Sequence, residues 1–265
     1  MLAFLLAMTF FITARWKCEQ RKLEEETKMI EKGQHSKVGL VLPHLFKMVW
    51  FVSVVSYEWQ CLWDMPWLPK FLGGKGEGSF FEQGPAEELT TFYEIQLAYH
   101  AHSMLFAFMV GAKPEMHLHH LVTILLIFLS DAMGYRRIGA VVFTLHDTPD
   151  IVGCAIKAAV VAEEKMLAIN IYVVLLAAWG YFRLYLLPTL IIEIIHSSNP
   201  YSHRVFFSVL LSVLVLLHYF WYLQFLLMAY NMRRTGKTRD ISETVVHPAD
   251  KVATLSSSSS KPQRH

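Results

Sequence analysis

The chain has 265 residues, of which 54% are hydrophobic and 17% charged, and its formal net charge is only +2. So small a charge does not indicate binding to nucleic acid, and three scattered cysteines give neither a disulfide framework nor the cysteine spacing of a zinc site. Long stretches without charge instead predict an all-α polytopic membrane protein with one compact membrane domain.

The apolar run at residues 1–14 is followed, rather than preceded, by basic residues. A cleaved signal peptide carries its positive charge before the apolar core, so the order here favours a first membrane helix, although the run is short for a span. Residues 15–37 are rich in charge and are expected to form a solvated amphipathic helix. Residues 1–37 are therefore expected to comprise an N-terminal membrane helix and a basic cytosolic segment.

Six further apolar segments predict membrane helices, which gives about seven in all. They cover residues 38–62, about 89–112, two runs within 116–157, about 166–187 and about 204–230. Glycine and proline predict a loop over residues 63–88, and residues 188–203 are expected to form another. A membrane domain over residues 38–234 then precedes a polar tail, 235–265, which is expected to be disordered because it cannot bury a core.

Lysine and arginine gather in residues 15–37 and 231–239, and this bias predicts that both segments are cytoplasmic. The C-terminus is then cytosolic, and seven spans place the N-terminus on the far side of the membrane. Arg136 and Arg137 are an exception to the bias, because this topology puts them on the far side.

Two neighbouring predicted helices carry ionisable side chains at positions where lipid would tolerate none. At about 100° per residue, the polar and ionisable side chains of each helix fall within roughly 100° of its circumference and so form one stripe. The first stripe is His119, His120, Thr123 and Ser130, and the second is Arg136, His146, Asp147, Asp150, Cys154 and Lys157. On the preceding helix, one face is shared by Tyr93, Gln96, His100 and Ser103. These stripes are predicted to face a shared interior.

Metal binding is the first role that such histidines and carboxylates could have. The iron sites of membrane desaturases and hydroxylases need HxxxH and HxxHH spacings, whereas this chain has HxHH at residues 117–120. His117 also points away from the stripe of His119, so no metal is expected, even though two or three histidines and two aspartates would suffice for one zinc ion.

The second role is acid–base or nucleophilic acyl chemistry, and the third is structural. A histidine paired with a carboxylate can deprotonate an amine or hydroxyl, or can itself accept an acyl group. Buried polar groups also need partners without any chemistry, and we favour this structural role for four histidines taken singly: His100, His102, His117 and His218. The set that we predict to carry chemistry is His119, His120, Asp147 and Asp150. Lys157 could serve only to neutralise an aspartate or to snorkel to the interface.

The stretch HHLVTILLIFLSDAMGYRRIGAVVFTLHDTPDIVGCAIK, residues 119–157, resembles the longevity-assurance motif of ceramide synthases, which are TLC-domain membrane proteins. The motif positions in this chain are His119, His120, Thr123, Ser130, Arg137, Gly139, His146, Asp147, Asp150 and Lys157. The resemblance extends to FYEIQLAYHAHS at residues 92–103 and to Arg183 in YFRLYLLP. It covers roughly residues 40–235.

The resemblance implies transfer of a fatty acyl group from acyl-CoA to the amine of a sphingoid base, such as sphinganine, in the endoplasmic reticulum membrane. It implies six helices in a TLC-type bundle around a central chamber, with an additional N-terminal helix. No metal and no cofactor are implied, since acyl-CoA is a co-substrate. The expected partners are fatty acyl-CoA, the sphingoid base and the lipid bilayer, with a homodimer allowed for and no nucleic acid.

The resemblance also implies roles for single residues. His119 would be the acyl acceptor or the general base, His120 its neighbour in proton transfer, and Asp147 and Asp150 would orient and polarise the amine. Residues expected to bind substrate or to support the site are His146, Arg137, Thr123, Ser130, Lys157, Tyr93, Gln96, His100 and Arg183.

The chain departs from the motif in places. The usual Asn before the Arg is absent, and a usual Glu three residues before Lys157 is replaced by Cys154. These departures bear on the identity of the substrate more than on activity. Two other interpretations stay open: a non-catalytic TLC protein that binds lipid or associates with the translocon, and a metal-dependent lipid hydroxylase.

Overall fold

The computed structural model describes residues 6–18, 20–21, 38–63, 65–78, 80–84 and 86–235. Within these ranges every regular element is a helix, which confirms the all-α fold class. Most of the expected cytosolic segment, from residue 22 to residue 37, lies outside the described residues. So does the expected disordered tail, apart from its first residue.

Seven labelled α-helices make up most of the described chain. They are α2 (Val38–Leu62), α3 (Thr90–Val110), α4 (Pro114–Ala132), α5 (Arg136–Val161), α6 (Lys165–Trp179), α7 (Leu187–His196) and α8 (Tyr201–Thr235). A π-helical segment, η3 (Gly180–Leu186), joins α6 to α7 without a break. The connection between α2 and α3 holds two 3-10 helices, η1 (Lys70–Leu72) and η2 (Glu87–Leu89). Residues 6–18 are helical as well.

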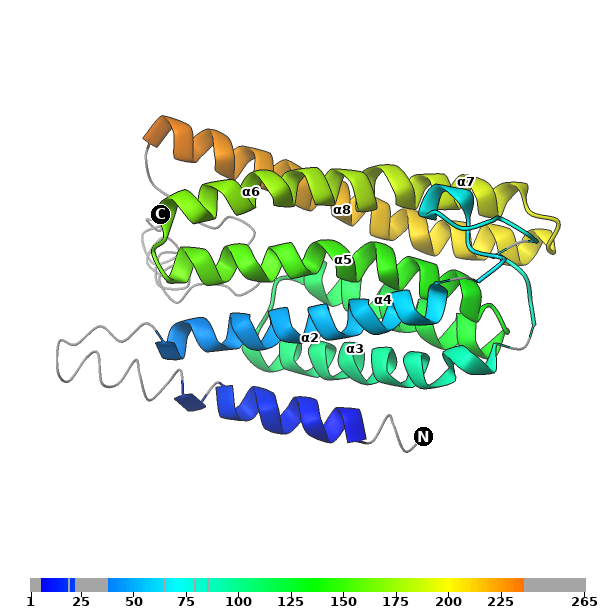
Figure 1. Cartoon of the computed structure of the whole chain (residues 1–265), viewed down its shortest axis with the longest axis horizontal. Helices are drawn as coiled ribbons and strands as arrows, with labels where there is room; N and C mark the ends of the chain where they lie inside the picture. Colours follow the sequence, from blue (N-terminus) through cyan, green and yellow to red (C-terminus); the bar gives the residue numbers. More distant parts are fainter. Residues whose placement is uncertain are drawn as a thin grey trace, which may run out of the picture.

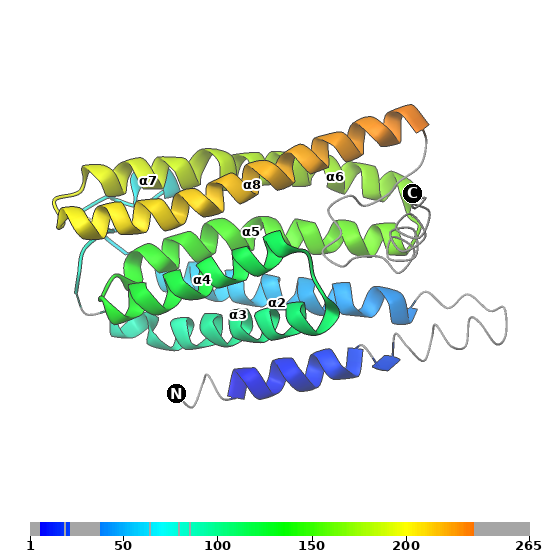
Figure 2. The ribbon, with the colours of Figure 1, turned by 180° about the vertical axis from the view of Figure 1, so that it is seen from behind.

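The helices lie side by side with roughly parallel long axes, and α5 runs through the middle of the assembly (Figure 1). It contacts α2, α4, α6 and η3. The view from behind brings α4 and α8 forward, and these two helices also contact each other (Figure 2). Helix α5 therefore faces most of the interior of the bundle, and its polar side chains meet residues from several other helices.

The two ends of the bundle differ in how the chain turns. One end, which we call the loop end, holds residues 65–78, 80–84 and 86–89 together with the α4–α5 and α7–α8 turns (Figure 1). Here Gly134 has a φ of +74°, and at the opposite end Gly111 closes α3 with a φ of +65°. Glycine adopts this left-handed backbone without a steric penalty, so both reversals fit in a few residues.

The structure corrects the predicted end of the sixth span. We expected the helix to end near Pro188 and residues 188–203 to form a loop, but α7 continues to His196 and only residues 197–200 separate it from α8. Pro188 lies in the first turn of α7, directly after η3. Because η3 leads into α7 without a break, Pro188 lies inside a continuous helix, where its missing N–H removes one backbone hydrogen bond to the preceding turn.

Two helices in the described part of the chain are long and apolar enough to cross a membrane: Lys165–His196 and Tyr201–Arg234. Only 17% and 33% of their most apolar windows are buried, so most of their apolar side chains face outward, as lipid-facing residues do. The predicted helices at 38–62 and 89–112 and the two runs within 116–157 do form helices, but they carry more polar residues. The count of seven spans stays a prediction.

The helix of residues 6–18 packs on the bundle beside α2 and α3 (Figure 1). The buried Phe11 ring lies 4.5 Å from the Trp50 ring on α2 and 5.4 Å from the Tyr99 ring on α3, between ring centroids. The guanidinium of Arg15 lies 3.7 Å from the centre of the Phe106 ring. The first apolar run is therefore joined to the bundle by aromatic contacts.

Candidate active site

Five histidine rings from four helices form a chain through the interior. The order is His100 on α3, His120 and His119 on α4, His218 on α8 and His146 on α5. Neighbouring ring centroids are 6.3, 5.4, 6.2 and 4.9 Å apart in that order. His100 and His218 are buried, whereas the other three are half-buried. The predicted stripes of α4 and α5 thus meet, and α3 and α8 each add a histidine.

His146 uses both of its ring nitrogens inside the protein. Its Nδ1 lies 2.6 Å from the Val142 carbonyl oxygen, and its Nε2 lies 2.9 Å from Nε2 of His218. The Nε1–H of Trp179 donates to the backbone carbonyl of His218 at 3.3 Å. The pair of histidines is therefore held by α5 on one side and by α6 on the other.

Arg183 ties the π-helical segment to α5. Its Nη2 donates to the backbone carbonyl of His146 and to the carboxylate of Asp150, both at 2.6 Å. The guanidinium also lies 3.9 Å from the centre of the Trp179 ring, and the residue is only 4% exposed. The wider π-helical turn changes the direction of side chains relative to an α-helix, and such segments recur at functional sites.

Asp147 forms a second buried cluster, on the side of α5 that faces α2 and α3. The Nε2 amide of Gln96 donates to Asp147 at 2.7 Å and to Glu58 at 3.0 Å. The two carboxyl groups also contact each other, and Glu58 and Asp147 are 1% and 3% exposed. Two buried carboxylates cannot both stay ionised so close together, so they share one proton.

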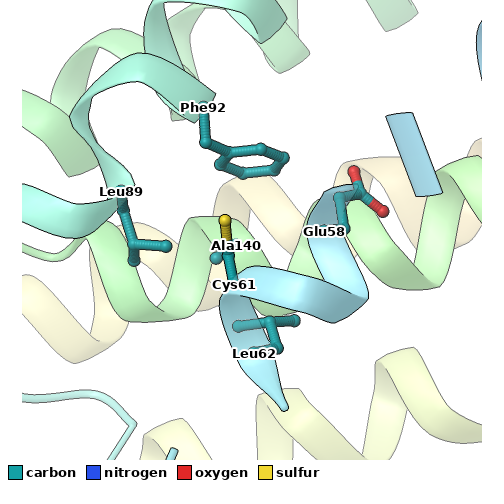
Figure 3. A pocket seen from close by; sticks show the side chains of 6 residues that line it. All are labelled: Glu58, Cys61, Leu62, Leu89, Phe92 and Ala140. Atoms are coloured by element: carbon teal, nitrogen blue, oxygen red, sulfur yellow. The ribbon is translucent and has the colours of Figure 1, made fainter. Parts of the chain in front are cut away.

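Figure 3 shows the apolar surroundings of Glu58. A narrow gap beside its carboxyl group is lined by Cys61, Leu62, Leu89, Phe92 and Ala140 and leaves no room for a water molecule. Oε2 of Glu58 has no hydrogen-bond partner among the described residues. A protonated, neutral carboxyl group is easier to bury in such surroundings than a carboxylate, so the shared proton suits Glu58.

Two motif residues, Ser130 and Gly139, form a joint with Tyr93 near the loop end instead of joining the histidine chain. The Tyr93 hydroxyl lies 3.1 Å from Ser130 Oγ and donates to the Arg136 carbonyl at 3.0 Å. A Cβ on Gly139 would lie 1.7 Å from that hydroxyl, so only glycine lets Tyr93 approach. Arg137 is at the loop end too, where it pairs with Glu82 at 3.3 Å.

The remaining predicted residues have local contacts. Thr123 donates its hydroxyl to the His119 carbonyl of its own helix at 2.8 Å. Lys157 lies in the neighbourhood of Lys47, Cys154 and Asp150. His117 faces away from the chain of histidines, since it bonds the Ala112 carbonyl at 3.1 Å and stacks on Phe108, as its position on α4 predicted.

Sequence reasoning missed Glu58 and took His218 for a structural residue. Each had a signal. Glu58 is the only acidic residue in the apolar run 38–62, and His218 is an ionisable residue deep inside the run 204–230. A lone ionisable group in a membrane helix usually marks an interior site. Within the described ranges, no group of three or more His, Cys, Asp or Glu has the geometry to hold a metal ion.

The sequence matches the TLC domain over residues 42–227, a range that contains the whole histidine chain, Arg183 and the carboxyl pair. The chain therefore belongs to the TLC-domain family.

Ceramide synthases are among the similar proteins. Ceramide synthase 5 of Mus musculus is 28% identical over 187 residues, which cover 67% of this chain and 44% of that protein. Ceramide synthase 4 of Bos taurus is 33% identical over 128 residues, covering 46% and 33% of the two chains. Ceramide synthase 1 LOH3 of Arabidopsis thaliana is 21% identical over 264 residues, covering 88% and 86%. The chain thus spans less than half the length of the two animal relatives. The resemblance drawn from the motif is confirmed.

Proposed function

We propose that the protein is a ceramide synthase, which transfers a fatty acyl group from acyl-CoA to the amine of a sphingoid base. The observation that carries the proposal is the half-buried pair His119 and His120, which faces His218 and His146 in one interior site. Nδ1 of each member of the pair meets no hydrogen-bond partner among the described residues, so it is available as a nucleophile or a base.

His119 is the acyl acceptor or the general base in this proposal, and His120 is its neighbour in proton transfer. In the net reaction the thioester C–S bond breaks, the amide C–N bond forms, and the amine proton ends on the thiol sulfur. Asp147 and Asp150 would orient and polarise the amine. Asp150 is the more accessible of the two, since its side chain is 34% exposed even while Arg183 holds one of its oxygens.

A lipid substrate also fits the apolar surface beside the site. A groove of about 310 Å³ between α5 and α6 is lined by Ile151, Val152, Ala155, Asn170, Ile171 and Val174. Ile151 directly follows Asp150 in the chain, so a lipid whose polar end is near Asp150 could lay its hydrocarbon chain in this groove. Such burial contributes roughly 0.8 kcal/mol for each CH₂ group that leaves water.

We further propose the membrane arrangement that the sequence predicted. Seven spans, six of them around a central chamber, would form a membrane domain over residues 38–234 in the endoplasmic reticulum, with the C-terminus cytosolic. The half-buried faces of His119 and His120 support a chamber that substrates can enter. Acyl-CoA would be a co-substrate and no cofactor would be bound. The proposal allows for a homodimer.

The experiment that tests the proposal is acyl transfer by purified full-length protein reconstituted in liposomes. His119→Ala is expected to abolish formation of the amide from acyl-CoA and sphinganine, while the protein keeps its unfolding temperature. The matched control is His117→Ala, two residues earlier on the same helix, which is expected to retain activity because His117 faces Phe108. Wild-type activity in the His119 variant would refute the proposed chemistry.

A further inference from the structure

His218 on α8 is fully buried and lies between two of the three histidines that the motif supplies, His119 and His146. Its ring centroid is 4.9 Å from that of His146 on α5 and 6.2 Å from that of His119 on α4. It comes from the last helix, far from the motif in sequence. Its hydrogen bonds decide what it can do.

The bonds of His146 fix the protonation of both rings. A carbonyl oxygen only accepts, so Nδ1 of His146, 2.6 Å from the Val142 carbonyl, carries the proton. In a neutral ring Nε2 of His146 is then a lone pair, and the hydrogen of the 2.9 Å bond belongs to Nε2 of His218. This leaves Nδ1 of a neutral His218 as a lone pair.

That lone pair is buried and unused. Nδ1 of His218 makes no hydrogen bond to any residue within the described ranges. A buried lone pair without a partner is available to receive a proton. His146 cannot take that role, since both of its ring nitrogens are already engaged.

His119 is the residue positioned to supply the proton. Its ring is edge-on to that of His218. The two ring centroids are 6.2 Å apart, only 1.3 Å farther than the centroids of the hydrogen-bonded pair His146–His218. A ring rotation or one bridging water closes such a gap, and catalytic hydrogen bonds commonly tighten when substrate binds. The Trp221 ring lies 5.4 Å from His119 and 5.6 Å from His218, and so shields the pair on one side.

We propose that His218 is the proton acceptor for His119 during acyl transfer, with His146 positioning it. This inference rests on the function proposed above, and it assigns a role to a residue of α8. His218 acts through His119 and does not need to touch the substrate. The step applies whether His119 accepts the acyl group or the amine proton.

The proton balance is the same in both cases. If His119 takes the acyl group, its second ring nitrogen carries a proton that must leave for the acyl-imidazole to be neutral. If His119 takes the amine proton, the ring becomes an imidazolium that must then give up a proton. In each case the proton passes to Nδ1 of His218, whose cationic ring donates from Nε2 to His146. It returns through His119, and the thiolate sulfur takes up the proton that the amine has lost.

His218→Gln is the decisive variant, because the glutamine amide can still donate to Nε2 of His146 while offering no base. In the reconstituted full-length protein we expect amide formation to fall in kcat by about a hundredfold, with KM for acyl-CoA changed by less than about threefold. The rate of the variant should also rise steadily with pH, because His119 must then release its proton to solvent. A residue with only a structural role would lower the rate equally at every pH.

The matched control is His203→Gln, the same substitution on the same helix at the loop end, where the ring bonds Tyr135. It is expected to keep the wild-type kcat and pH profile. A His218→Gln variant with wild-type kcat and pH profile would overturn the role of His218 while leaving the proposed function intact. A wild-type protein that forms no amide would instead overturn the proposed function, and the proton relay with it.

A measurement on the wild-type protein covers the case in which His218→Gln does not fold. Nitrogen-15 NMR of histidine-labelled protein in bilayers distinguishes the two neutral forms of each ring, and His218 is expected with a proton on Nε2 and none on Nδ1. A proton found on Nδ1 of His218 in the resting protein would contradict the proposal.

Discussion

The histidine chain and the loop end are both polar, but they are built differently. At the loop end the Tyr135 hydroxyl lies 2.7 Å from Nδ1 of His203 and donates to Asn199 at 3.3 Å, and the Tyr135 ring stacks on Phe81 at 4.6 Å. Burial raises the pKa of Tyr135 above its ordinary value, which keeps the hydroxyl a neutral donor. In the histidine chain, by contrast, Nδ1 of four rings has no partner among the described residues.

The difference separates stability from chemistry within one motif. Polar groups that only hold a fold together are expected to satisfy each other, as the side chains around Tyr135 do. Groups that bind a substrate or transfer a proton are expected to keep hydrogen-bond donors or acceptors without a protein partner. Nδ1 is unpaired in His102 and His117 as well, so the division between the two regions rests on position in the bundle as much as on hydrogen bonds. The following changes test that division.

Arg183→Gln should give the largest effect of these changes. The guanidinium holds both the His146 carbonyl and Asp150 at 2.6 Å, and a glutamine can reach only one of them. Displacement of α5 at the site by a fraction of an ångström is expected to lower kcat for amide formation by about a hundredfold. The measurement is steady-state kinetics in liposomes.

The loop end supplies the control for Arg183. Arg137→Gln breaks a half-exposed ion pair with Glu82, which contributes about 0–1 kcal/mol, and removes a guanidinium that lies 5.5 Å from the centre of the Trp67 ring. Its kcat should stay within about threefold of the wild type. If Arg137→Gln were as damaging as Arg183→Gln, the division into two regions would be wrong.

Gly139→Ala should damage the fold and spare the chemistry. The new Cβ would lie 1.7 Å from the Tyr93 hydroxyl and 3.2 Å from Ser130 Oγ, so α3 or α5 must shift. Overpacking of this kind destabilises by about 2 kcal/mol, which should appear as a lower unfolding temperature in detergent. The activity of each folded molecule should be little changed.

A second substitution sharpens that result. Tyr93→Phe removes the hydroxyl that the new Cβ would meet, so the double variant is expected to recover part of the lost stability. A Gly139→Ala protein that is fully stable but inactive would contradict this account and would move Gly139 into the active site.

How far the sequence predicts the molecule depends on the kind of feature. Helical periodicity placed His119 and His120 on one face of α4 correctly, because the direction of a side chain on a helix is local information. The predicted end of the sixth span was wrong. A proline usually stops a helix, but here Pro188 lies in the first turn of α7, directly after η3. Periodicity at about 100° per residue also cannot anticipate a π-helical turn, which is what directs Arg183 toward α5.

Contacts between distant helices could not be predicted at all. The sequence marks Glu58 as the one acidic residue of its apolar run and His218 as an ionisable residue deep inside another, yet it does not say which helices they meet. Only the packing of α2 and α8 around α5 and α4 brings Glu58 to Asp147 and His218 to His146. Gln96 was predicted to lie on a polar face, but its role as donor to both carboxyl groups required the structure.

Glu58→Gln should give the smallest effect, and it tests whether the carboxyl pair is structural. If Glu58 is the neutral member, glutamine imitates it: the amide oxygen accepts from Gln96 and the amide nitrogen donates to Asp147. Amide formation should then stay within about threefold of the wild type and the unfolding free energy within about 1 kcal/mol.

Glu58→Leu is the necessary contrast, because leucine keeps the approximate volume and removes the donor to Asp147. The carboxylate of Asp147 would then be buried with Gln96 as its remaining donor, and the loss is expected to reach about 3 kcal/mol in stability. If Glu58→Gln were as inactive as His119→Ala, Glu58 would have to ionise during the reaction. The carboxyl pair would then belong to the proton-transfer machinery together with the histidine chain. Of the polar contacts of α5, only those near Tyr93 and the loop end would remain structural.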